Sequence, residues 1–208
     1  MTPKDVTRLW EVLRHRDPEE KLDWIRQLAK DPTPDGVEVL LEALEQESWF
    51  LRDQAANALA SMGESVLEPL VQRLDCGLWF TRAAAATALG RMGSPDAAPA
   101  LTNLLRDPNR TVRDAGGDAL VALARHDTSV HAVAEAFAAL PERALRFALD
   151  AIYARDAEAG DRVAALVADP ALRAASERVG LPRAAGDEGG GLAWLDVVGP
   201  DVEPGPAS

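Results

Sequence analysis

A chain of 208 residues with 47% hydrophobic and 27% charged residues has the composition of a folded soluble protein, either one domain or one short solenoid. Its 34 acidic and 22 basic residues give a formal net charge of -12, which disfavours a nucleic-acid partner because such a surface repels phosphate backbones. The single cysteine, Cys76, cannot form an internal disulfide, and no segment has the length and apolarity to span a bilayer. We therefore expect a cytoplasmic protein with no membrane partner.

Two helices are predicted ahead of the first partner helix and the first clear motif. Thr2 and Pro3 are typical of a helix start, and the apolar stripe that follows predicts a capping helix. Asp17-Pro18 restarts the chain, and residues 22–29 carry a second stripe whose Leu28 lies 31 residues before Leu59. This second helix is interpreted as a diverged copy of the motif described next.

One stretch, residues 49–63 (WFLRDQAANALASMG), organises the rest of the chain. It recurs as residues 79–93 (WFTRAAAATALGRMG) and, more weakly, as residues 110–124 (RTVRDAGGDALVALA). A period of this size, with no phosphate-binding loop between copies, indicates stacked helical units. The anchor positions repeat at steps of 30 and 31 residues: Arg52, Arg82 and Arg113, and again Leu59, Leu89 and Leu120.

A leucine-rich partner helix is predicted before each copy, over residues 37–44, 66–74 and 97–105. Gly63 and Gly93 stand where a helix C-terminus favours a left-handed residue. After residue 128 the pattern weakens, as expected for terminal repeats that face water on one side. The weaker helices are predicted over residues 130–137, 141–152, 163–167 and 172–179.

Residues 1–180 are thus assigned to the solenoid and residues 181–208 to a flexible tail rich in glycine and proline. The tail contains one apolar island, residues 192–198 (LAWLDVV), with Trp194 and Leu195 as candidate contact residues. Three interpretations stay open for it: a short motif offered to another protein, intramolecular docking in the groove of its own solenoid, or a plain disordered end.

Small residues dominate the motif helix, where Ala55, Ala56 and Ala58 allow neighbouring helices to approach closely. The third copy has Gly116 and Gly117 in place of the paired alanines. Because glycine weakens a helix by roughly 1 kcal/mol relative to alanine, we predict either a soft point or an unusually close helix contact there.

The string W-[FY]-[LV]-R-x-x-A-A-x-A-L-G-x-M-G resembles the HEAT-like repeat of the phycobilisome-lyase type. Residues 49–63 and 79–93 match it well, and residues 110–124 match it moderately. The resemblance implies an all-α fold, a right-handed α-solenoid of about five HEAT-like helix pairs with one binding face. Its members include scaffolds, chromophore lyases and other enzymes, so it implies little about activity.

Two sets of residues are candidates for binding a partner. The first is the aromatic pairs of copies one and two, for which the alternative is that one ring of each pair fills the corner between repeats. The second is the variable positions of the motif helix, which the resemblance places outside the core, and for which a solvated face is the alternative. The first set is Trp49, Phe50, Trp79 and Phe80, with Arg110 at the matching place in copy three; the second includes Asp53, Gln54, Asn57, Thr87, Arg91 and Asp118.

Arg52, Arg82 and Arg113 are interpreted as structural, each bonded to an acid or a carbonyl between repeats. No catalytic, metal or cofactor site is expected. The His-Glu dipeptides of di-iron HEAT-like enzymes are missing, and His126 and His131 have no third ligand of suitable spacing.

These observations favour a non-enzymatic scaffold or adaptor that presents one solenoid face to a protein or peptide. The alternative, by resemblance, is a chromophore-lyase-like enzyme or an accessory subunit of one.

Overall fold

The computed structural model describes residues 18–30 and 33–168, and every regular element within these two ranges is a helix. The expected all-α solenoid is confirmed. The predicted capping helix near the N-terminus, the segment 172–179 and the whole tail 181–208, with Trp194 and Leu195, lie outside the described residues.

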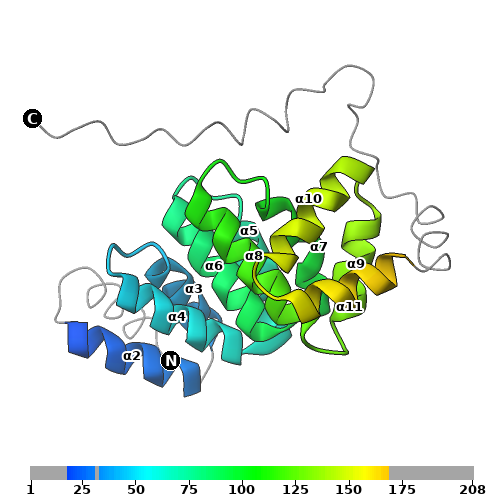
Figure 1. Cartoon of the computed structure of the whole chain (residues 1–208). Helices are drawn as coiled ribbons and strands as arrows, with labels where there is room; N and C mark the ends of the chain where they lie inside the picture. The colour runs from blue at the N-terminus through cyan, green and yellow to red at the C-terminus, as the bar shows by residue number, and fades with distance from the viewer. Residues whose placement is uncertain (1–17, 31–32, 169–208) are drawn as a thin grey trace, which may run out of the picture.

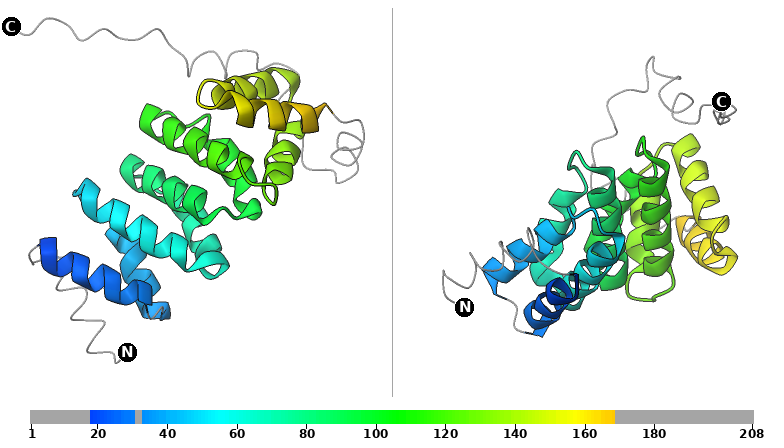
Figure 2. Two further views of the ribbon diagram at one scale, coloured as in Figure 1. Left: turned by 60° about the horizontal axis from the view of Figure 1, so that its bottom comes forward. Right: turned by 90° about the vertical axis from the view of Figure 1, so that its left-hand side faces the viewer.

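The helices form two layers (Figure 1). The motif helices α2 (Pro18–Lys30), α4 (Trp49–Ser61), α6 (Trp79–Met92) and α8 (Arg110–Ala124) lie side by side in one layer, as the left view of Figure 2 shows. This arrangement agrees with the interpretation of α2 as a diverged motif helix.

The partner helices form the second layer. They are α3 (Pro34–Ala43), α5 (Leu67–Arg73), α7 (Ala98–Leu104) and α9 (Val130–Ala138), and short 3-10 turns, η1 (Gly63–Val66) and η2 (Pro95–Ala97), precede α5 and α7. Helices α10 (Glu142–Tyr153) and α11 (Ala157–Val167) close the described solenoid by packing on each other and on α8 and α9.

Local sequence signals set the ends of these helices. The Thr33 hydroxyl accepts a hydrogen bond from the Gly36 N–H (3.1 Å) at the start of α3, and the Asn109 side chain accepts one from the Thr111 N–H (2.9 Å) at the start of α8. Gly63 and Gly93 have φ values of 64° and 72°, so the predicted left-handed residues after α4 and α6 are confirmed.

The core lies between the layers and follows the repeat. The anchor leucines Leu59, Leu89 and Leu120 are fully buried, as are Phe137 and Ile152 in the weaker repeats. The paired alanines of α4 and α6 are buried beside them, which lets the motif helices approach closely, as predicted.

The glycines of α6 and α8 mark close contacts. A Cβ added at Gly116 would lie 2.8 Å from the Leu104 Cβ of α7, and one added at Gly90 would lie 2.7 Å from the Ala119 Cα of α8. At Gly117 the neighbour is the guanidinium of Arg155, 2.5 Å from the added Cβ. Of the two interpretations of Gly116 and Gly117, the structure supports the close contact.

Candidate functional site

A groove of about 510 Å³ runs over the exposed faces of α4, α6 and α8. Each helix contributes a stripe of residues spaced by three and four, as expected when one face of a helix lines a surface. The lining consists of aromatic rings, small residues and a few charged groups. On α4 it comprises Trp49, Arg52, Asp53 and Ala56; on α6 Trp79, Phe80, Ala83, Ala84, Thr87, Gly90 and Arg91; on α8 Thr111, Asp114, Ala115, Asp118, Ala119 and Ala122.

Aromatic rings mark the end of the groove where α4 and α6 begin. Trp49 is 70% exposed and Trp79 is 44% exposed, although both line the groove. The alternative in which one ring of each pair fills the corner between repeats is therefore wrong for the first pair, because Phe50 is 46% exposed as well. Phe80 is the half-buried ring, and it meets Trp79 edge-on with 5.7 Å between ring centroids.

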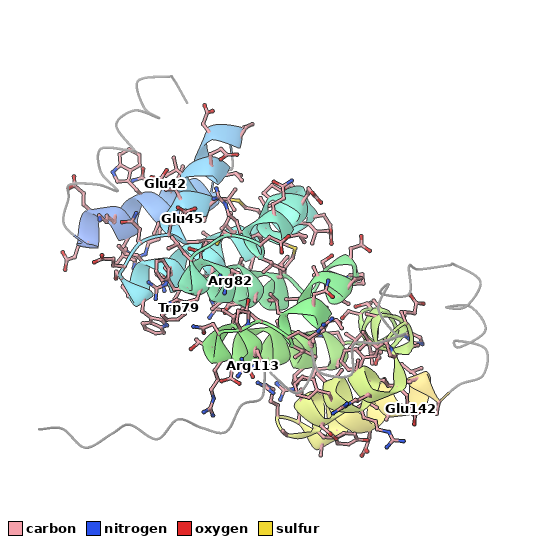
Figure 3. All side chains as sticks on the ribbon, turned by 90° about the horizontal axis from the view of Figure 1, so that it is seen from above. Glu42, Glu45, Trp79, Arg82, Arg113 and Glu142 are labelled. Carbon is pink, nitrogen blue, oxygen red and sulfur yellow. The ribbon has the colours of Figure 1, made fainter. Side chains whose placement is uncertain are left out.

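The three anchor arginines make the same pair of hydrogen bonds. In each, Nη1 donates to the carbonyls six and five residues earlier, as in the bonds from Arg52 to Gln46 (2.6 Å) and Glu47 (2.8 Å). The corresponding acceptors are Cys76 and Gly77 for Arg82, and Asp107 and Pro108 for Arg113. A structural role for these arginines is confirmed, but the shared carbonyl bonds lie within one helix pair rather than between repeats. Arg82 and Arg113 are labelled in Figure 3.

Arg82 carries an additional carboxylate. Its Nε and Nη2 donate to the two oxygens of Asp107 at 2.8 and 3.0 Å, which ties α6 to the loop before α8. The two side chains are only 13% and 8% exposed. The hydrogen bond to Asp107 raises the pKa of Arg82 although burial opposes it.

Arg52 lacks that additional partner among the described residues. Its guanidinium lies 4.9 Å from the centre of the Phe80 ring, a cation–π contact, and burial lowers the pKa of Arg52. Asp107, the acid that bonds Arg82, stands six residues before the next anchor arginine, Arg113. The equivalent position for Arg52, six residues before Arg82, holds Cys76. The position that supplies the carboxylate to Arg82 therefore holds a thiol in the preceding repeat.

The remaining charged groups of the groove are paired across helices. Arg91 of α6 bonds Asp53 of α4 at 2.6 Å. Arg155, which follows α10, bonds Asp114 at 2.8 Å and Asp118 at 2.9 Å, both on α8. The two aspartates of α8 that line the groove are therefore already bonded within the protein.

The structure brings together seven of the predicted partner-binding residues and leaves four others outside the groove. Trp49, Asp53, Trp79, Phe80, Thr87, Arg91 and Asp118 line it, whereas Phe50, Gln54, Asn57 and Arg110 do not. Arg110 is exposed and faces Asp114 at 3.7 Å on its own helix.

Sequence reasoning missed two cations of this site. The shared motif predicts only a structural bond for Arg52, although Cys76 stands where Arg82 has Asp107 as its partner, and this difference marks Arg52 as distinct. Arg155 is separated by 37 and 41 residues from the aspartates that it bonds, so no local pattern could have indicated it.

Neither a metal site nor a membrane span was found in the part of the chain that the structure describes. Residues 18–30 and 33–168 contain no group of three or more His, Cys, Asp or Glu side chains placed to hold a metal ion. Over the same ranges, no helix combines the length and apolarity needed to cross a bilayer.

Two layers of helices repeating every 30 or 31 residues, with a groove across one layer, define an α-solenoid. A family model described as HEAT repeats matches residues 6–77 and 67–152, which is more than half of the chain. The chain belongs to the HEAT-repeat family.

Comparisons with individual proteins add little to this. The crystal structure of an engineered protein, solved by the Northeast Structural Genomics Consortium, is 19% identical; the match covers 85% of this chain and 98% of that one. Its TM-score against this chain is 0.41. The search of curated proteins gave no match.

Proposed function

We propose that this HEAT-repeat protein is a non-enzymatic scaffold whose α4–α6–α8 groove binds a segment of a protein or peptide in the cytoplasm. The observation that carries the proposal is the pair of exposed tryptophans, Trp49 and Trp79, at one end of a groove built on packed helices. Tryptophan and arginine are the residues that contribute most often to binding energy at protein interfaces.

The architecture supports this function through its rigidity. The groove residues stand on helices whose backbones are held by buried leucines, close glycine contacts and the arginine–carbonyl bonds. A surface that is ordered before binding loses little conformational entropy on association, so a small number of contacts gives useful affinity.

The finer assignment to the phycobilisome-lyase type remains a prediction from the motif. No feature of the groove favours a chromophore over a peptide, because its charged groups other than Arg52 are already paired within the protein. A bilin absorbance that copurifies with the protein would favour the lyase-like alternative.

The proposal is tested with random 12-residue peptides displayed on phage and selected against the full chain. Selected peptides should bind the wild type and lose at least about tenfold in affinity with Trp49→Ala and Trp79→Ala combined. Phe50→Ala is the matched control, because Phe50 is also exposed on α4 but lies outside the groove. Peptide binding that is indifferent to both tryptophans would overturn the proposal.

A further inference from the structure

We infer that the groove has an occupant within the same chain, residues 192–198 (LAWLDVV), with Asp196 bound to Arg52 and Trp194 packed against Trp49 and Trp79. The inference rests on the proposed function, since it assigns a ligand chemistry and a competitor to the same groove. The ligand chemistry is a carboxylate beside an aromatic ring.

One edge of the Arg52 guanidinium has no carboxylate partner among the described residues. The Nη1 atom is used by two carbonyls, as in the other anchor arginines. In Arg82 the opposite edge, Nε and Nη2, holds Asp107 through two bonds. The described residues place no carboxylate on the same edge of Arg52, because Cys76 replaces the acid and the adjacent Asp53 is turned to Arg91.

The surroundings of Arg52 define what can bind there. The Phe80 ring lies on one side of the guanidinium, with 4.9 Å between its centre and the Arg52 Cζ, and the Nε–Nη2 edge suits a carboxylate in the two-bond geometry of the Arg82–Asp107 pair. Phe80 also contacts Trp79, at 5.7 Å. A ligand that places an acid on Arg52 therefore has an aromatic surface immediately beside that acid.

The other charged groups of the groove already have partners of opposite charge. Arg91 is bonded to Asp53, and Arg155 is bonded to Asp114 and Asp118. Of the cations lining the groove in the described part of the chain, Arg52 is the one that lacks a carboxylate. An incoming carboxylate is therefore expected to bind Arg52.

The segment 192–198 has the matching pattern. Trp194 and Asp196 are two residues apart, so in an extended chain their side chains point to the same side and are about 7 Å apart. Since Arg52 and Trp79 both touch Phe80, one such pair can reach both. Residues 181–208 contain five acids and one base, and only Asp196 among these acids lies between two aliphatic residues, Leu195 and Val197.

The intervening chain is long enough. Residues 169–191 separate the end of the described solenoid from the segment, and a chain of that length reaches at most roughly 75 Å. From α11 the groove begins at α8, which α11 contacts, and ends at α4, two helices further. With about 8–10 Å between neighbouring helices, this distance is on the order of 30 Å.

The inference is tested on the full chain by ¹H–¹⁵N NMR, in which the Nε–H of Arg52 and the indole N–H groups of Trp49 and Trp79 report on the groove. Asp196→Asn should shift the Arg52 signal, and Trp194→Ala should shift both indole signals. Asp201→Asn is the matched control, since it removes a tail acid outside the segment and should leave all three signals in place. If both segment variants leave the three signals unchanged, the inference is wrong.

A second variant tests the role of Arg52 without removing it. Cys76→Asp should fill the open edge of Arg52 as Asp107 fills that of Arg82. A synthetic peptide of residues 190–200, added to the full chain carrying Trp194→Ala and Asp196→Asn, should bind at least about tenfold more weakly once Cys76→Asp is also present. Unchanged affinity would refute the pairing of Asp196 with Arg52.

Two further outcomes separate this inference from other possibilities. Dilution of the wild-type chain should leave the Arg52, Trp49 and Trp79 signals in place. If dilution moves them to their positions in the segment variants, docking within one chain is contradicted and the segment comes from a second copy. If the tail variants are silent but phage-selected peptides still shift the Trp49 and Trp79 signals, only this inference fails. If neither the tail nor the selected peptides act on the groove, the proposed function fails as well.

Discussion

The α6–α8 pair and the α4–α6 pair are built from the same repeat, yet the first is held by a two-bond ion pair and a close backbone contact that the second lacks. Between α6 and α8, Gly90 lies against the Ala119 backbone, and Arg82 is bonded to Asp107. One repeat earlier, Ala60 stands at the place of Gly90 and Cys76 at the place of Asp107.

The two repeats thus differ at two contact positions, with Ala60 in place of Gly90 and Cys76 in place of Asp107. The arginine–carbonyl bonds and the buried leucines are the same in both repeats, so they carry the fold. The difference teaches that one missing carboxylate leaves the Arg52 edge open in a frame that is otherwise shared with Arg82.

Removing the Asp107 carboxylate, which bonds Arg82, should have the largest effect on stability. Asp107→Ala would leave Arg82 largely buried without its acid and also remove the acceptor of the Asn109 N–H, so we expect a loss of about 3 kcal/mol in the free energy of unfolding. Asp75→Ala, at an exposed acid before α6, is the control and should change stability by less than about 0.5 kcal/mol. Equal effects in urea denaturation would show that stability does not depend on this pair.

The close approach of α6 and α8 is tested at Gly90. By helix propensity alone, Gly90→Ala would raise stability by about 1 kcal/mol. The added Cβ would lie 2.7 Å from the Ala119 Cα, which belongs to the backbone and cannot turn aside, so we expect a net loss of about 2 kcal/mol. A rise in melting temperature would contradict the close contact between Gly90 and Ala119.

The paired glycines of α8 should respond differently from each other. Gly116→Ala places its Cβ 2.8 Å from the Leu104 Cβ and should cost about 1–2 kcal/mol. Gly117→Ala meets the far end of Arg155, which can move at the expense of exposed ion pairs with Asp114 and Asp118, so its net effect should be close to zero. Thermal denaturation of the two single variants measures both, and a similar large loss in each would show that Arg155 is held rigidly.

The smallest effect on stability is expected from the Arg125–Asp156 pair, a counterpart of Arg82–Asp107 in which the arginine is 63% exposed. The Ala159 N–H and then Arg125 hold the pKa of Asp156 below its usual range. A carboxyl whose pKa is depressed by folding stabilises the fold above its unfolded pKa of about 3.9, and this contribution is lost as the pH falls through its lower folded value.

An NMR titration should therefore place the midpoint of Asp156 below about 3.9, with the Ala159 N–H shifting at the same pH. Arg125→Ala should raise that midpoint only in part, because the bond from Ala159 remains. A midpoint at or above about 3.9 in the wild type would contradict the cap.

The fold was predictable from sequence because periodicity and anchor positions survive in three copies. The left-handed glycines Gly63 and Gly93 and the arginine bonds followed from local rules and are confirmed. The fate of the tryptophans was not predictable, since exposed and corner-filling rings share one pattern.

The groove itself was only half predictable. The pattern separates core from non-core positions, but Asp53 and Gln54 are both outside the core and only Asp53 lines the groove. Which flank of a helix faces the groove depends on how neighbouring helices cross, and that is set by tertiary contacts such as Gly90 on Ala119.

The arginine–carbonyl bonds also bear on the order in which the chain folds. Each joins residues only five or six apart, so it closes when a single helical hairpin forms, and closing a loop of about ten residues takes on the order of 10–100 ns. The Arg82–Asp107 pair spans 25 residues and joins one hairpin to the next. We therefore expect each hairpin to form first, with its own arginine bonds, and the Arg82–Asp107 pair to join neighbouring hairpins afterwards. Folding of this kind can begin in any central repeat and grow outward.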